Sequence, residues 1–108
     1  MQIQGNPKIT IVQGDSYTRE ILFEQLYYDL IESVFFSSNK LAVCKKLLKD
    51  ETNNIFVLHL ESNETKNYPI GTYDYDLTIK FINEDIKTAQ YQSIISILEK
   101  NNKVICYE

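Results

Sequence analysis

The strongest constraint on the fold of this chain is an unbroken alternation of apolar and polar residues over residues 72–81. The apolar positions are Tyr73, Tyr75, Leu77, Ile79 and Phe81, and the polar positions are Thr72, Asp74, Asp76, Thr78 and Lys80. Successive side chains of a β-strand point to opposite sides, so this pattern predicts a long strand with one buried and one hydrated face. The preceding Tyr68-Pro69-Ile70-Gly71 predicts a turn.

Turn-forming residues recur at short intervals and divide the rest of the chain into short segments typical of β-strands. The expected strands cover residues 8–12, 16–24, 32–37, 41–48, 55–60 and 72–82, with a last strand within residues 86–98. Residues 41–48 and 91–98 also fit helical spacing, but we assign both to strands because the other segments already require a large sheet.

Two further segments complete the predicted fold. Residues 55–60 are apolar on both sides, which predicts a strand buried on both faces. The polar segment at residues 62–67 suits a single helical turn. The sequence therefore predicts an all-β, antiparallel β-sandwich of about seven strands with one short helical turn near residues 62–67.

Length and composition describe one globular domain over residues 1–108, because a chain of this size can bury a single core. The net charge of −4 and the single arginine, Arg19, argue against a nucleic-acid partner. No apolar run approaches the ~18–20 residues that span a bilayer, so no membrane partner is expected. Residues 1–7 lack the basic region followed by an apolar region that marks a signal peptide, so we expect synthesis in the cytoplasm.

Residues that could carry chemistry are few. The single histidine, His59, lies in an apolar run and is expected to be a core or rim residue. Cys44 and Cys106 have no metal-binding spacing with it and are expected to remain free thiols in a reducing compartment. The three glycines, at positions 5, 14 and 71, are too far apart for a phosphate-binding loop. The sequence predicts no catalytic residue, no cofactor and no metal.

Asp74 and Asp76 leave two interpretations open. They lie on one face of the expected strand, and paired carboxylates can bind calcium or transfer protons. The simpler interpretation is that both side chains hydrate the outer face of that strand.

The eight tyrosines suit either a contact surface or the half-buried rim of a sandwich. We expect Tyr27 and Tyr28, in the loop before residue 32, to be exposed contact residues together with Tyr91. Tyr73 is expected to lock a structural corner formed with Pro69 and Gly71, because such a tyrosine bonds back to the backbone in sandwich folds.

The order of these features resembles the immunoglobulin-like β-sandwich domains of tailed-bacteriophage virion proteins, such as the N-terminal domain of baseplate upper proteins. The resemblance covers about residues 8–99 and rests on Gln13-Gly14-Asp15 after the first strand, on the polar turn at residues 62–66 and on the corner from Pro69 to Tyr73. Two features depart from the pattern. We expect no fibre or receptor-binding extension, and Asn83-Glu84-Asp85 stands in place of an Asp/Gly-rich hairpin.

The resemblance implies a non-enzymatic structural protein of a phage or prophage virion, made in the host cytoplasm. It would be an accessory component that decorates the capsid or joins the tail or baseplate by docking on other virion proteins, and a homo-oligomer is compatible with that role. Two alternatives stay open, an intracellular inhibitor of a host protein and a carbohydrate-binding module. The lack of tryptophan counts against the second.

Overall fold

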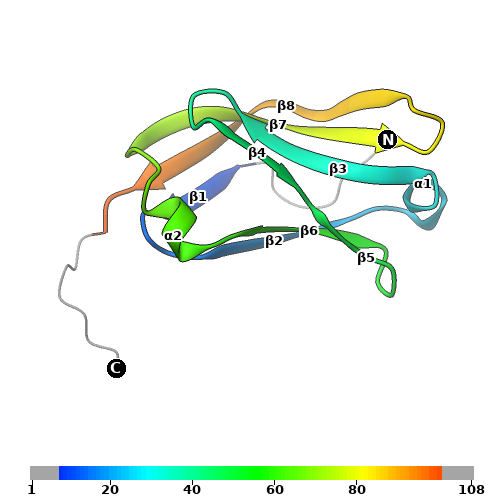
Figure 1. Ribbon diagram of the computed structural model, residues 1–108, viewed down its shortest axis with the longest axis horizontal. Coiled ribbons are helices and arrows are strands. Elements are labelled where there is room, and N and C mark those ends of the chain that lie inside the picture. Colours follow the sequence, from blue (N-terminus) through cyan, green and yellow to red (C-terminus); the bar gives the residue numbers. More distant parts are fainter. Residues whose placement is uncertain (1–7, 101–108) are drawn as a thin grey trace.

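Two stacked β-sheets form the protein in the computed structural model, which describes residues 8–100 (Figure 1). The strands are β1 (Ile9–Val12), β2 (Tyr17–Leu22), β3 (Ile31–Ser38), β4 (Val43–Lys46), β5 (Leu48–Asp50), β6 (Ile55–Leu60), β7 (Gly71–Phe81) and β8 (Ile86–Leu98). Two short helices are α1 (Gln25–Tyr28) and α2 (Ser62–Thr65). The five-stranded sheet has the order β1-β8-β7-β3-β4, and the three-stranded sheet has the order β2-β6-β5. The prediction of an all-β sandwich is confirmed.

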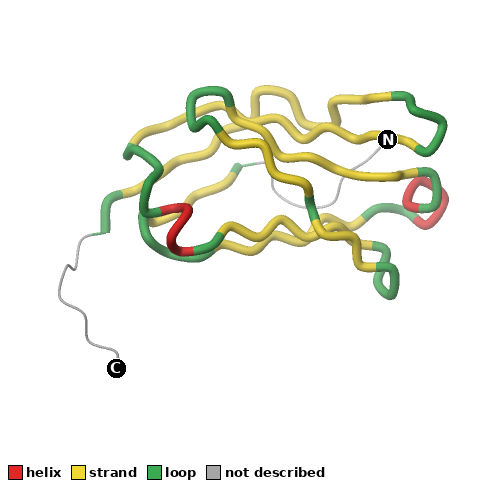
Figure 2. Tube along the Cα trace, viewed as in Figure 1, coloured by secondary structure: helices red, strands yellow, loops and turns green. Residues whose placement is uncertain are grey.

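The alternation over residues 72–81 forms β7, which lies between β8 and β3 in the larger sheet. Its apolar face packs inward, with Tyr75, Leu77 and Ile79 buried, while Thr72 and Asp74 are exposed. Figure 2 shows the strands of the two sheets as two layers, and buried residues from both layers form one hydrophobic core. The strand that the sequence predicted best is therefore the one that organises the larger sheet.

Residues 41–48 do not form the single strand that was expected. Residues 43–46 pair with β3 as the predicted hairpin, whereas β5 pairs with β6 in the other sheet. Leu47 lies at the crossing and is buried in the core, and Leu48 then faces outward on the smaller sheet. Crossing from one sheet to the other interrupts the strand alternation, which explains why this segment also fitted a helical spacing.

One strand pair departs from the antiparallel prediction. β1 runs parallel to β8, with Ile9 opposite Ile95 and Val12 opposite Leu98. Ile9 and Ile11 are buried, so the strand contributes its apolar side to the core. All other pairs between the described strands are antiparallel.

The predicted helical turn, α2, is fastened to the turn that follows β1. Thr65 is fully buried, and its hydroxyl accepts a hydrogen bond from the Gly14 N–H (3.1 Å) and donates one to the Asp15 carbonyl (2.7 Å). The Ser62 hydroxyl donates to the Gly14 carbonyl, and the Gln13 amide donates to the Tyr68 carbonyl. Gly14 has a φ of 89°, a conformation that glycine adopts without steric cost.

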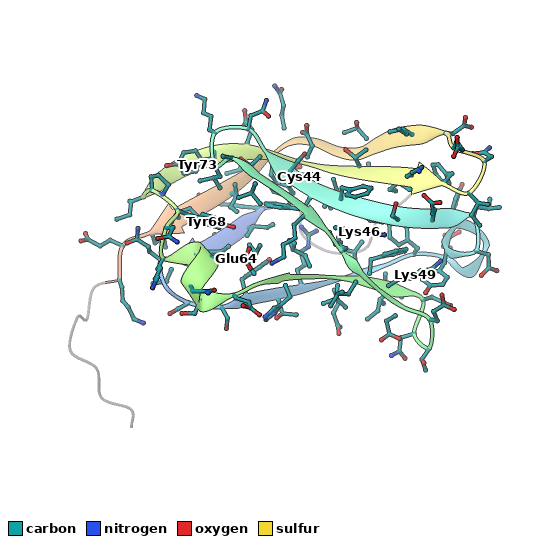
Figure 3. The ribbon with its side chains drawn as sticks, viewed as in Figure 1. Cys44, Lys46, Lys49, Glu64, Tyr68 and Tyr73 are labelled. Atoms are coloured by element: carbon teal, nitrogen blue, oxygen red, sulfur yellow. The ribbon has the colours of Figure 1, made fainter. Side chains whose placement is uncertain are left out.

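The corner before β7 is closed by its tyrosine. The Tyr73 hydroxyl donates a hydrogen bond of 2.8 Å to the Pro69 carbonyl, and Figure 3 labels Tyr73 at this end of the sandwich. Gly71 has a φ of 150°, and a Cβ at this position would lie 3.2 Å from the Tyr73 hydroxyl oxygen. A glycine therefore lets the tyrosine ring fold back over the turn.

Candidate docking surface

Of the three tyrosines expected at an interface, Tyr28 is not exposed as predicted. Tyr28 is in α1 and is 4% exposed, with its ring 5.5 Å from the Phe56 ring and its hydroxyl donating to the Asp50 carbonyl. The prediction that it is exposed is wrong, because α1 turns the ring into the core. Burial, followed by the nearby carboxylates of Glu51 and Asp50, raises the pKa of the Tyr28 hydroxyl. Tyr27 is half-buried, and the Tyr91 side chain lies outside the described part of the structure.

Packing within the domain accounts for the other described tyrosines. Tyr68 and Tyr75 are buried, and Tyr17 and Tyr73 are half-buried. The Tyr75 hydroxyl accepts a hydrogen bond of 3.0 Å from Arg19, and burial raises the pKa of that hydroxyl. These rings thus serve the core and its rim.

The residues considered for chemistry are dispersed over the structure. His59 is half-buried on β6, and its Nδ1 forms a hydrogen bond of 2.7 Å with the Thr18 hydroxyl. Cys44 is exposed and free on β4, while Cys106 lies outside the described residues. Within residues 8–100, no three His, Cys, Asp or Glu side chains gather as a metal-binding group, and no helix is long and apolar enough to cross a membrane.

Asp74 and Asp76 share the outward face of β7 but differ in their contacts. The Asp76 carboxylate accepts a hydrogen bond of 2.7 Å from the Gln92 N–H. Gln92 has a φ of 50° and lies where the register between β7 and β8 shifts. Asp76 therefore satisfies a backbone N–H at a β-bulge, whereas the Asp74 side chain is exposed.

Asp76→Ala is expected to lower the free energy of unfolding by about 1 kcal/mol, because it leaves the Gln92 N–H at the bulge without its carboxylate. Asp74→Ala is the matched control on the same strand face and should change it by less than about 0.5 kcal/mol. Urea unfolding of both variants measures the difference. Equal losses would show that the Asp76 contact does not stabilise the bulge.

An uncovered apolar surface lies on the outward face of the smaller sheet. In antiparallel pairs, directly opposite residues share one face. Leu48 lies opposite Val57, and Leu22 lies opposite Ile55. We call these four residues the apolar strip. Leu48 and Leu22 are 67% and 45% exposed, Val57 is half-buried and Ile55 is only 8% exposed. No helix or strand within residues 8–100 lies over this face of the sheet (Figure 1).

The smaller sheet has the apolar strip on its outward face and the hydrophobic core on its inward face. Phe56, Leu58 and Leu60 point inward and are buried, while on the outward face of the same strand Ile55 is also buried (8% exposed) and Val57 is half-buried. The prediction that β6 is buried on both faces is therefore met on the inward face and at Ile55, but not at the half-buried Val57 and His59. The apolar run over residues 55–60 was the sequence signal for this surface.

Carboxylates stand at two corners of the apolar strip. Glu20 lies opposite Val57 on β2, and Asp50 lies opposite Ile55 on β5. Hydrogen bonds from the Asn53 side chain and the Thr52 N–H hold the pKa of the Asp50 carboxyl below its usual value. The Asp50 corner is thus negatively charged at neutral pH, and Glu20 is the acidic residue at the other corner.

The architecture defines an immunoglobulin-like β-sandwich whose smaller sheet presents an uncovered apolar strip. Among solved structures, the fold is similar to the fibronectin(III)-like modules of Clostridium thermocellum CbhA, with a TM-score of 0.55 and 7% sequence identity over 86% of this chain. The match spans 42% of the length of that structure, and at this identity it shows the fold alone. The sequence matches no protein-family model and no curated protein.

Proposed function

We propose that this protein is a non-enzymatic structural component of a tailed-phage or prophage virion. It would act as an accessory protein of the capsid, or of the tail or baseplate, by docking on other virion proteins. The observation that carries the docking role is the apolar strip, where strands with a complete core on one side expose leucines on the other. The order of turns and strands resembles that of virion β-sandwich domains, and this resemblance supports a role in a virion.

Docking through the apolar strip is energetically reasonable for a small protein. Fully burying a leucine side chain contributes roughly 1.5–3 kcal/mol, and Leu22 and Leu48 keep about half or more of that surface exposed. One such contact is weak, but copies on a repeating particle surface gain avidity when they are linked to one another or to the same assembly. The net charge of −4 would keep free copies apart before docking.

The test is a double variant, Leu22→Thr with Leu48→Thr, whose incorporation into purified particles is compared with that of the wild type. We expect incorporation to fall about tenfold or more, which corresponds to ~1.4 kcal/mol of binding free energy. Threonine keeps the strand propensity, so the free energy of unfolding should change little. The control is Ile70→Thr with Leu98→Thr. These side chains are 52% and 45% exposed and lie outside the apolar strip, so the control removes a similar exposed apolar area.

A pull-down with the wild-type protein separates this role from that of an inhibitor. Capsid or tail proteins recovered with the wild type, and lost with the strip variant, would support the proposal. Recovery of one host enzyme without any virion protein would overturn it. Normal incorporation of a folded strip variant would remove the apolar strip as the docking surface.

A further inference from the structure

We propose that the virion surface that covers the apolar strip carries two basic side chains, one facing Glu20 and one facing Asp50. This inference rests on the proposed function and specifies the chemistry of the partner. It follows from where the two carboxylates lie around the strip and from the lack of a basic side chain beside either of them within residues 8–100.

The register of the smaller sheet places the two carboxylates at opposite corners. One row across the three strands is Leu48, Val57 and Glu20, and the next row is Asp50, Ile55 and Leu22. Neighbouring strands are about 4.8 Å apart and two residues along a strand span about 6.8 Å, so the two corner positions are roughly 12 Å apart. A partner therefore meets an apolar centre with a negative charge at each end of its diagonal.

Within residues 8–100 neither carboxylate has a basic partner, although the Asp50 carboxylate accepts hydrogen bonds from the Thr52 and Asn53 N–H groups and from the Asn53 side chain. Ion pairs join Lys45 to Glu64, Lys80 to Glu32 and Lys100 to Asp15, and none of these pairs includes Glu20 or Asp50. The lysine nearest in sequence to Asp50 is Lys49, labelled in Figure 3. Its ammonium group donates to the Ile31 carbonyl and lies 5.0 Å from the centre of the Tyr28 ring, on the core side of the sheet.

A second copy of this chain fits the surface poorly. In a twofold contact the same patch meets itself, so each carboxylate would face an apolar group or the other carboxylate. Burying a charged carboxylate without an opposite charge beside it is costly, and like charges in contact disfavour binding. A partner with an apolar surface bordered by lysine or arginine would satisfy both the exposed leucines and the two carboxylates. It buries the leucines and pairs the acids.

The test measures binding of the purified protein to particles that lack it, at about 0.05 and 0.5 M NaCl, where screening of exposed charges differs strongly. Glu20→Lys is expected to weaken binding about tenfold or more at the lower salt concentration, and Glu20→Gln by less. Raising the salt should weaken wild-type binding more than Glu20→Gln binding. The control is Asp74→Lys, which makes the same charge change on an exposed position of the other sheet.

The outcomes separate this inference from the proposed function. One outcome is that the Leu22→Thr, Leu48→Thr variant loses binding while Glu20→Lys binds as the wild type does. This result would overturn the proposed basic side chains of the partner and leave docking by the apolar strip in place. Unchanged binding by both variants would overturn both. Sedimentation of the wild type should show a monomer, and a dimer that the strip variant abolishes would identify a second copy as the occupant and overturn the inference.

Discussion

Phe36→Ala is expected to lower the free energy of unfolding by about 3–5 kcal/mol, which is the usual cost of removing a buried phenylalanine ring. Phe36 is fully buried on β3, directly opposite Leu77 of β7. Its ring centre lies 5.2 Å from that of Tyr75. Because a domain of this size is stable by roughly 5–15 kcal/mol, the variant should lose a large part of its stability.

The measurement is urea unfolding followed by tyrosine fluorescence, since the chain contains no tryptophan. The adjacent residue provides the control, because Phe35 is half-buried on the opposite face of the same strand. Phe35→Ala should cost about 1 kcal/mol, near the average for single substitutions. If both variants lost the same stability, the assignment of inward and outward faces on β3 would be wrong.

The larger sheet could be predicted from the sequence because its central strand obeys a local rule. From Tyr73 to Phe81, each side chain has the polarity that its face requires, so no distant contact is needed to assign the strand. The Gly71 turn and its following tyrosine are equally local, and the hydrogen bond from Tyr73 spans only four residues. Such features depend on neighbouring residues along the chain.

The features that could not be predicted depend on residues far apart in sequence. Tyr28 is buried because α1 places its ring against Phe56, and a helix of one turn forms through such tertiary contacts rather than through its own propensity. The shift of register at Gln92 adds residues to β8 without a counterpart in β7. This bulge breaks the alternation over residues 86–98, which explains why that segment fitted two kinds of secondary structure.

The sequence indicates the apolar strip but not what covers it. The run from Ile55 to Leu60 indicated correctly that both faces of β6 favour burial. A pattern of polarity does not distinguish a cover that belongs to the same domain from one that another protein supplies. Only the position of β6 between β2 and β5, with its outward face uncovered, turned this run into a candidate docking surface.

Thr65→Val is expected to lower the free energy of unfolding by about 1–3 kcal/mol, although valine has nearly the same shape as threonine. The substitution removes the hydroxyl that accepts from the Gly14 N–H and donates to the Asp15 carbonyl. Thr65 is fully buried, so water cannot easily replace these bonds. The substitution would therefore weaken the attachment of α2 to the turn after β1.

The control for this link is Thr65→Ser, which keeps the hydroxyl and removes only a methyl group. It should cost about 1 kcal/mol, the contribution of one buried carbon, and urea unfolding compares it with the valine variant. Hydrogen exchange of the Gly14 amide provides a local measurement, because exchange should accelerate in Thr65→Val more than in Thr65→Ser. A serine variant less stable than the valine variant would mean that the methyl packing of Thr65, and not its two hydrogen bonds, holds α2 against the turn.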